Sequence, residues 1–65
     1  MDRKDPKYEQ IKAFVKGYNY ITLNEIQKKF KLGFNESLTV YKLLEQDKII
    51  APKNEKQVGR KVLVH

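Results

Sequence analysis

The chain contains no cysteine, so neither a disulfide nor a thiolate metal site can hold its fold together. Its 65 residues leave room for one domain, and a domain of this size buries only roughly 60% of the surface that its unfolded chain exposes. Stability must therefore come from one apolar core. The large apolar side chains recur at helix-like and strand-like intervals, and the candidate core residues are Ile11, Phe14, Ile26, Phe30, Val40, Leu44 and Ile50.

The N-terminal part of the sequence predicts an arm followed by a helix. Residues 1–6 mix charges without apolar periodicity, which favours a flexible arm. Asp5 can cap a helix and Pro6 suits its first turn, and apolar side chains then recur every three or four residues along 7–16. Gly17 predicts the end of this helix, because glycine readily adopts the left-handed conformation that ends helices.

A short strand and a second helix are predicted next. Residues 18–21 are rich in side chains that favour strands. Thr22 and Glu25 match a capping box, in which the Thr22 hydroxyl accepts from the amide of Glu25 and the Glu25 carboxylate reaches back to the amide of Thr22. We therefore expect a helix over residues 23–31.

A tight turn and a third helix complete a helix-turn-helix pattern. Gly33 permits a positive φ, which suits a turn between two helices. Asn35 is the expected N-cap of a helix over residues 36–47, with Glu36 near its positive end.

The C-terminal part predicts a β-hairpin. Residues 48–51 and 60–64 are strand candidates, and the polar loop 52–59 joins them. The predicted fold is an α+β winged helix-turn-helix over residues 7–65, in the order α-β-α-α-β-β.

The third predicted helix separates into an apolar side and a polar side. At about 100° per residue, one side carries Ser37, Val40, Tyr41, Leu44 and Asp47, which we expect to face the core. The opposite side is wholly polar, and such amide and ammonium groups can bind base edges or phosphates. We therefore predict that a duplex-DNA surface on this side contains Asn35, Thr39, Lys42 and Gln46.

Basic residues precede and follow this helix. The net charge is +6, from 14 Lys and Arg against 8 Asp and Glu, which favours binding to a polyanion such as DNA. Phosphate contacts position a reading helix, so basic flanks are what DNA binding requires. The predicted flanking contacts are Lys28, Lys29 and Lys31 before the turn, and Lys53, Lys56, Arg60 and Lys61 in or beside the loop, which would act as the wing.

Binding to a protein is the alternative that the sequence leaves open. Any solvated helix face is polar, and a carboxylate at the start of a reading helix repels phosphate. Aromatic and leucine side chains on an exposed surface can anchor a partner protein or a second copy of the chain. The residues that favour this alternative are Tyr18, Tyr20, Glu36, Leu38 and Leu43.

Several other classes of protein find no support in the sequence. His65 is a single histidine at the C-terminus, and Gly17, Gly33 and Gly59 are too widely spaced for a phosphate-binding loop. No run approaches the roughly 20 apolar residues of a membrane-spanning helix, and residues 1–8 lack the apolar region of a secretion signal. We therefore expect no catalytic residue, metal, cofactor, small-molecule substrate or membrane contact, and a cytoplasmic location.

Residues 8–64 resemble the gamma domain of the bacterial DNA translocase FtsK. The resemblance is carried by Leu-Gly-Phe-Asn at residues 32–35, by residues 44–50, and by Gly-Arg-Lys-Val-Leu-Val at residues 59–64. It implies a winged helix that recognises short polar sequences on the chromosome. Asn35 and Arg60 match contact positions of that family.

The resemblance departs from the family at one position. The family typically has arginine directly after the turn asparagine, where this chain has Glu36, so the family's target sequence is not carried over. Small winged helices of this size also occur among phage and mobile-element regulators of transcription. We expect either a free-standing regulator of that kind or an excised domain.

Overall fold

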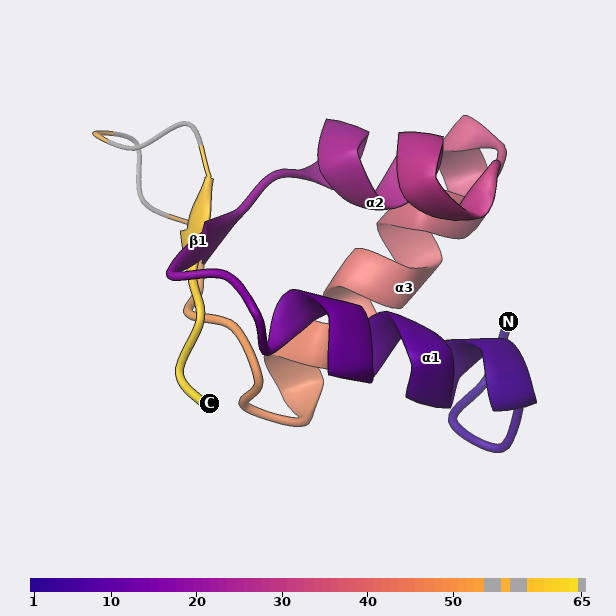
Figure 1. Ribbon diagram of the computed structural model, residues 1–65, viewed down its shortest axis with the longest axis horizontal. Coiled ribbons are helices and arrows are strands. Elements are labelled where there is room, and N and C mark those ends of the chain that lie inside the picture. The colour runs from indigo at the N-terminus through magenta and orange to yellow at the C-terminus, as the bar shows by residue number, and fades with distance from the viewer. Residues whose placement is uncertain (54–55, 57–58, 65) are drawn as a thin grey trace.

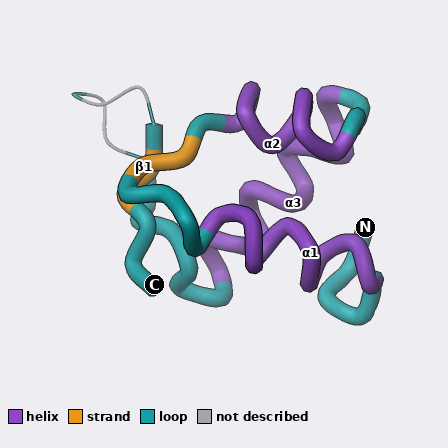
Figure 2. Tube along the Cα trace, viewed as in Figure 1, coloured by secondary structure: helices purple, strands orange, loops and turns teal. Residues whose placement is uncertain are grey.

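The computed structural model describes residues 1–53, 56 and 59–64. Within them the element order is α1 (Pro6–Val15), β1 (Tyr20–Ile21), α2 (Leu23–Phe30), α3 (Phe34–Gln46) and β2 (Arg60–Lys61). The helices make up most of the domain, and the strands lie at the end opposite the N-terminus (Figures 1 and 2). The expected small α+β winged helix is confirmed.

The sheet is shorter than predicted, and its two strands are not the predicted hairpin pair: residues 60–61 pair with β1 rather than with 48–51. β1 and β2 are antiparallel, with Tyr20 opposite Lys61 and Ile21 opposite Arg60. The predicted strand 48–51 is reduced to one antiparallel bridge between Ile50 and Val62. Hydrogen bonds on either side of this bridge, from Ala51 N to Lys61 O at 2.8 Å and from Leu63 N to Ile49 O at 2.8 Å, keep this segment along β2.

The predicted signals for the starts of the first two helices are confirmed. The Asp5 carboxylate accepts from Lys7 N at 2.9 Å, and Pro6 opens α1. At α2 the Thr22 hydroxyl accepts from Glu25 N at 3.2 Å, and Glu25 Oε1 accepts from Thr22 N at 3.1 Å. Each pair satisfies backbone donors that a helix start otherwise leaves without partners.

The helices end close to the predicted residues, but the conformations expected at Gly17 and Gly33 and the N-cap expected at Asn35 are wrong. Neither Gly17 nor Gly33 has a positive φ; the left-handed residue of the turn is Lys31, with φ of 54°. Gly33, with φ of −69°, is itself the N-cap residue of α3, so Asn35 lies inside the first turn instead of capping it. The reversal comes two residues earlier because Leu32, which follows Lys31, must enter the core, where it is 6% exposed.

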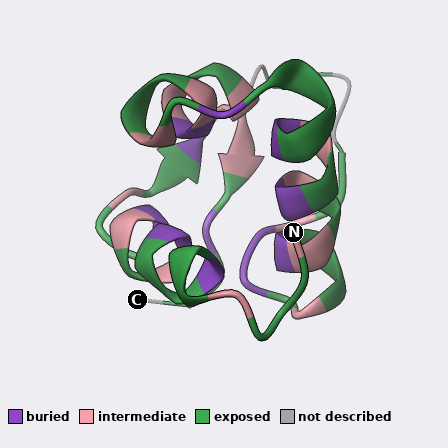
Figure 3. Cartoon of the chain, turned by 90° about the vertical axis from the view of Figure 1, so that its right-hand side faces the viewer, coloured by how far each residue is buried: buried purple, intermediate pink, exposed green. Residues whose placement is uncertain are grey.

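The core lies between the three helices and the strands, and in each helix the buried residues face the interior (Figure 3). Five predicted core residues are buried: Ile11, Ile26, Val40, Leu44 and Ile50. They are joined by Tyr8, Val15, Ile21, Leu32, Ile49 and Val62.

Phe14 and Phe30 are only partly buried, contrary to the prediction. Their rings meet edge to face with centroids 5.5 Å apart, and Phe14 also contacts Tyr18 at 5.0 Å. The three rings therefore pack against one another at the margin of the core, where α1 and α2 approach.

Candidate nucleic-acid interface

α3 presents the polar face that the sequence predicts. Ser37, Val40 and Leu44 are buried, and the Ser37 hydroxyl donates to Gly33 O at 2.7 Å, so its polar atom is satisfied inside the domain. The opposite face is exposed to solvent along the whole helix. The four predicted reading residues on that exposed face are Asn35, Thr39, Lys42 and Gln46.

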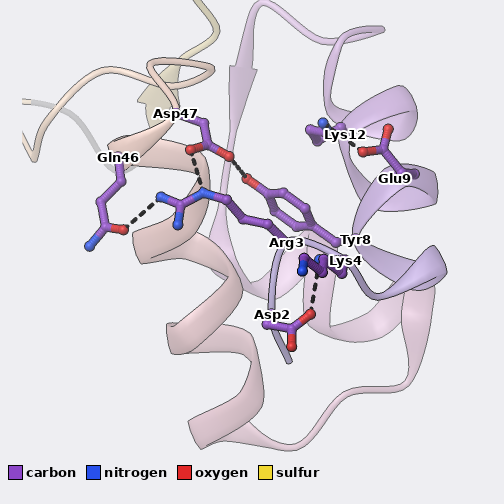
Figure 4. A network of polar contacts seen from close by, with 8 residues as sticks. All are labelled: Asp2, Arg3, Lys4, Tyr8, Glu9, Lys12, Gln46 and Asp47. Atoms are coloured by element: carbon purple, nitrogen blue, oxygen red, sulfur yellow. Dashed lines mark hydrogen bonds and ion pairs between the residues drawn. The ribbon is translucent and has the colours of Figure 1, made fainter.

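These four residues differ in how much of their polar chemistry is already used. The Thr39 hydroxyl donates to Asn35 O at 3.1 Å within the helix. Gln46 Oε1 accepts from Arg3 Nη2 at 2.9 Å (Figure 4). Lys42, in the middle of the face, has no hydrogen bond or ion pair within the described part of the chain. Its charge is therefore available to a ligand that approaches α3.

The lysines before the turn lie at the C-terminal end of α2 and are exposed. Lys28 and Lys29 belong to the last turn of the helix, and Lys31 follows it in the left-handed conformation. Lys29 Nζ lies 5.9 Å from the centroid of the Phe14 ring, so this side chain is directed toward α1. Lys28 and Lys31 are exposed and have no such contact in the described residues.

The predicted wing lies partly outside the described residues. Positions 54, 55, 57 and 58 of the loop 52–59 are among those not described. Lys53, Lys56 and, on β2, Lys61 are exposed.

Arg60 occupies a different environment from the lysines beside it. Its Nη1 donates to Glu45 Oε1 at 2.6 Å and to Ala51 O at 3.0 Å, and the guanidinium lies 4.8 Å from the centroid of the Tyr41 ring. The side chain is only 17% exposed. The structure therefore places Arg60 as a link between β2 and α3, with most of its side-chain surface covered by protein.

Tyr41 and Asp47 supply the other polar links between α3 and the rest of the domain. The Tyr41 hydroxyl donates to Ile21 O at 2.8 Å, and burial raises the pKa of this hydroxyl. Asp47 accepts from the Tyr8 hydroxyl and from Arg3, and these hydrogen bonds, with Tyr8 the larger, lower the pKa of its carboxyl. Together they fix the orientation of α3 on the core.

The residues predicted for protein contact do not gather on one exposed surface. Tyr18 and Leu43 pack against the core, and Leu38 is half-buried. Tyr20, 49% exposed, and Glu36 remain open, on β1 and on the first turn of α3 respectively.

Two candidate residues were missed by reasoning from the sequence. Phe34 is 60% exposed and opens α3 directly before Asn35, but its exposure becomes visible only once the helix start is known. Arg3 reaches the end of α3 from a segment without periodicity, so the sequence carries no signal for it.

The described residues contain no group of three or more His, Cys, Asp or Glu side chains suited to a metal ion. Among the helices described, none is long and apolar enough to cross a membrane.

Two comparisons with known proteins were informative to different degrees. A search of curated proteins found no match to the chain. The family model described as "Ftsk gamma domain" matches residues 2–65, nearly the entire chain. This confirms the resemblance seen at the turn and in the last strand. The chain belongs to the Ftsk gamma domain family, a family of DNA-binding winged helices.

Proposed function

We propose that the domain binds duplex DNA with α3 in the major groove and the loop 52–59 on the phosphate backbone. The observation that carries the proposal is the exposed polar face of α3, on which Lys42 has no hydrogen bond or ion pair to any residue that the structure describes. The 13 residues of α3 extend about 20 Å, and a major groove about 12 Å wide admits an α-helix.

Each exposed side chain of α3 suits a particular group in the groove. Asn35 can pair with adenine through both amide atoms, and Lys42 can bind guanine or a phosphate. The exposed ring of Phe34 suits the methyl group of thymine. Thr39 and Gln46 complete the proposed reading set.

The flanking lysines suit phosphate contacts. Lys28 and Lys31 lie on one side of the turn, and Lys53, Lys56 and Lys61 lie in or beside the loop. In the proposal Lys29 and Arg60 contribute mainly through the net positive charge, because each is directed at an aromatic ring or a carboxylate of the domain itself. Binding through phosphates weakens with salt by a log–log slope of about −0.9 per contact.

A salt titration of duplex affinity tests the proposal, with single-stranded DNA and RNA as competitors. We expect Lys42→Ala to lower duplex affinity and to reduce the salt slope by about 0.9. Lys7→Ala, at an exposed position in the first turn of α1, removes the same charge from a different helix and is the matched control. Absence of duplex binding by the unaltered domain at low salt would reject the proposal.

A single domain of this size is expected to bind DNA weakly by itself. One module of this kind covers only about 600–1,000 Å² of protein surface on DNA, so tight binding needs a homodimer, an array or a tethered partner. We also propose that the domain regulates transcription in a phage or another mobile element. Footprinting on the DNA that flanks the gene for this chain tests that role. Sedimentation with and without duplex DNA tests whether the domain assembles.

A protein partner is the second candidate function, favoured by exposed apolar side chains near the strands. Tyr20 is 49%, Leu63 48% and Val64 41% exposed. Tyr20 lies opposite Lys61, two residues before Leu63, so Tyr20 and Leu63 share the outer face of the sheet. Amide-shift mapping distinguishes the two functions: shifts confined to this face on adding a partner, and none on adding DNA, would favour the second.

A further inference from the structure

Arg3 binds the end of α3 at two adjacent residues. Its Nε donates to Asp47 Oδ1 at 2.7 Å, and its Nη2 donates to Gln46 Oε1 at 2.9 Å (Figure 4). The Tyr8 hydroxyl donates to the other oxygen of Asp47 at 2.7 Å. The guanidinium is therefore held by a carboxylate that is itself fixed to the buried face of α1.

This contact determines which atoms Gln46 offers to solvent. A guanidinium has donors and no acceptor, so the amide atom that faces Arg3 must be the oxygen. The amino group of Gln46 then points away from Arg3. Because Gln46 is exposed and shares its face with Lys42, this amino group is presented on the proposed DNA-reading side.

We propose that Arg3 is a positioning residue that makes Gln46 present its amino group, so that Gln46 selects guanine at the base pair it meets. This inference rests on the proposed binding of DNA by α3. In the major groove guanine offers two acceptors, N7 and O6, whereas adenine pairs an acceptor, N7, with the N6 amino donor. A glutamine amide that pairs with adenine needs its oxygen to accept from N6.

The Gln46 oxygen has a second lone pair, but two-point pairing with adenine needs both amide atoms to face the base edge, and that turn would take Oε1 away from Arg3. With Oε1 directed at Arg3, the amino group of Gln46 can donate to the acceptors of guanine, and N6 of adenine meets an unfavourable second donor. Loss of Arg3 frees the amide to turn, and the two-point pairing with adenine becomes available. Arg3 thereby sets a base preference without itself touching a base.

The same arm provides a control for charge. Lys4 neighbours Arg3 in sequence and is exposed, and the hydrogen bond recorded for it runs from its backbone N to Asp2 at 2.9 Å. Lys4→Ala therefore removes one positive charge from the arm and leaves the contact between Arg3 and Gln46 in place.

The test is selection from a duplex library with randomised base pairs, followed by sequencing of the bound fraction. The unaltered domain is compared with Gln46→Ala, Arg3→Ala and Lys4→Ala at a temperature where circular dichroism shows all four folded. Gln46→Ala identifies the base pair that Gln46 meets, because its guanine preference disappears there. At that same pair we expect Arg3→Ala to shift the guanine-to-adenine ratio toward adenine by roughly fivefold or more. Lys4→Ala is expected to weaken all sequences alike.

Other results would overturn the inference. If Arg3→Ala weakens all sequences alike, as Lys4→Ala does, or if the unaltered domain prefers adenine at the Gln46 position, Arg3 does not set the preference, and DNA binding by α3 still stands. Failure of the unaltered domain to bind any duplex overturns both proposals. Should Arg3→Ala unfold at the assay temperature, Arg3→Met replaces it, with the same expected shift, because methionine keeps a long apolar stem and has no donor for Gln46.

Discussion

The hydroxyl of Tyr8 donates a 2.7 Å hydrogen bond to Oδ2 of Asp47, and so joins the buried side of α1 to the residue that follows α3. Tyr8 is 0% exposed, whereas the Asp47 side chain is 26% exposed. The remaining oxygen of Asp47 accepts from Arg3. One carboxylate therefore connects the N-terminal arm, α1 and the end of the proposed reading helix.

Tyr8→Phe tests the contribution of this hydrogen bond to stability. The ring stays in the core while the bond to a charged acceptor is lost, so we expect the free energy of unfolding to fall by about 1–2 kcal/mol. Urea unfolding measures the change. Tyr20→Phe removes a hydroxyl from an exposed ring and should leave the midpoint unchanged. Equal effects of the two substitutions would contradict a specific role for the Tyr8 hydroxyl.

Acid should destabilise the domain through Asp47. The hydrogen bond from Tyr8, and then that from Arg3, lower the pKa of Asp47 below its ordinary value of 3.8. A carboxyl whose pKa is lower in the folded state contributes stability above the unfolded value and loses it as the pH falls through the folded one. We therefore expect unfolding free energy to decline below about pH 4, and Asp47→Asn to show a shallower decline.

Alkali should destabilise the domain through Tyr8. Burial, followed by the hydrogen bond to Asp47, raises the pKa of Tyr8 above its ordinary value of 10.0. The contribution of a raised pKa is complete below the unfolded value and is lost as the pH rises toward the folded one. Unfolding curves should therefore show falling stability above pH 10.0, and Tyr8→Phe should lose part of this alkaline limb. An unchanged limb in Tyr8→Phe would assign it to other groups.

Arg60→Ala should affect folding more than Lys61→Ala does. The substitution removes the hydrogen bonds from Arg60 to Glu45 and Ala51 and the contact of its guanidinium with the Tyr41 ring. We therefore expect the free energy of unfolding to fall by about 1–2 kcal/mol. Lys61 is exposed, and its substitution should leave the unfolding midpoint nearly unchanged and reduce the salt slope of DNA binding. The reverse pattern in paired unfolding and binding measurements would show that Arg60 serves DNA and not the fold.

Glu36→Arg should strengthen DNA binding at a small cost in stability. The carboxylate lies in the first turn of α3, where it interacts favourably with the positive end of the helix. Reversal of its charge should cost about 0.3–1 kcal/mol in unfolding free energy. It should also raise duplex affinity and steepen the salt slope by up to about 0.9. Glu36→Gln removes the repulsion without adding a cation, so its duplex affinity should lie between that of the unaltered domain and that of Glu36→Arg. If neither substitution changes the affinity, Glu36 does not lie near the phosphates.

Features set by neighbouring residues were predictable from the sequence. The Asp5 cap and the capping box of Thr22 and Glu25 depend on side chains at most three residues from their partners. The inward side of α3 follows from helical periodicity, and Ser37 was correctly placed there despite its polarity. Placement of the polar face of α3 on the outside follows from the same period.

Features set by distant residues were not predictable. Arg3 binds Asp47, which lies 44 residues later in the sequence, and Arg60 binds Glu45, which lies 15 residues earlier. A sequence pattern shows that a basic residue is present without showing which carboxylate it meets. Phe14 and Phe30 were predicted as core for a related reason, since period alone does not separate the centre of a core from its margin.

The ends of α2 and α3 share a left-handed backbone conformation that glycine adopts most readily. Lys31, with φ of 54°, and Lys48, with φ of 60°, are both left-handed, and each directly precedes a residue that is 6% exposed, Leu32 or Ile49. A left-handed conformation costs a residue with a side chain roughly 1–2 kcal/mol, which glycine does not incur. A laboratory selection for heat resistance alone should therefore favour glycine at both positions. Each replacement of lysine by glycine would also remove one positive charge, so the more heat-resistant variants should bind polyanions more weakly.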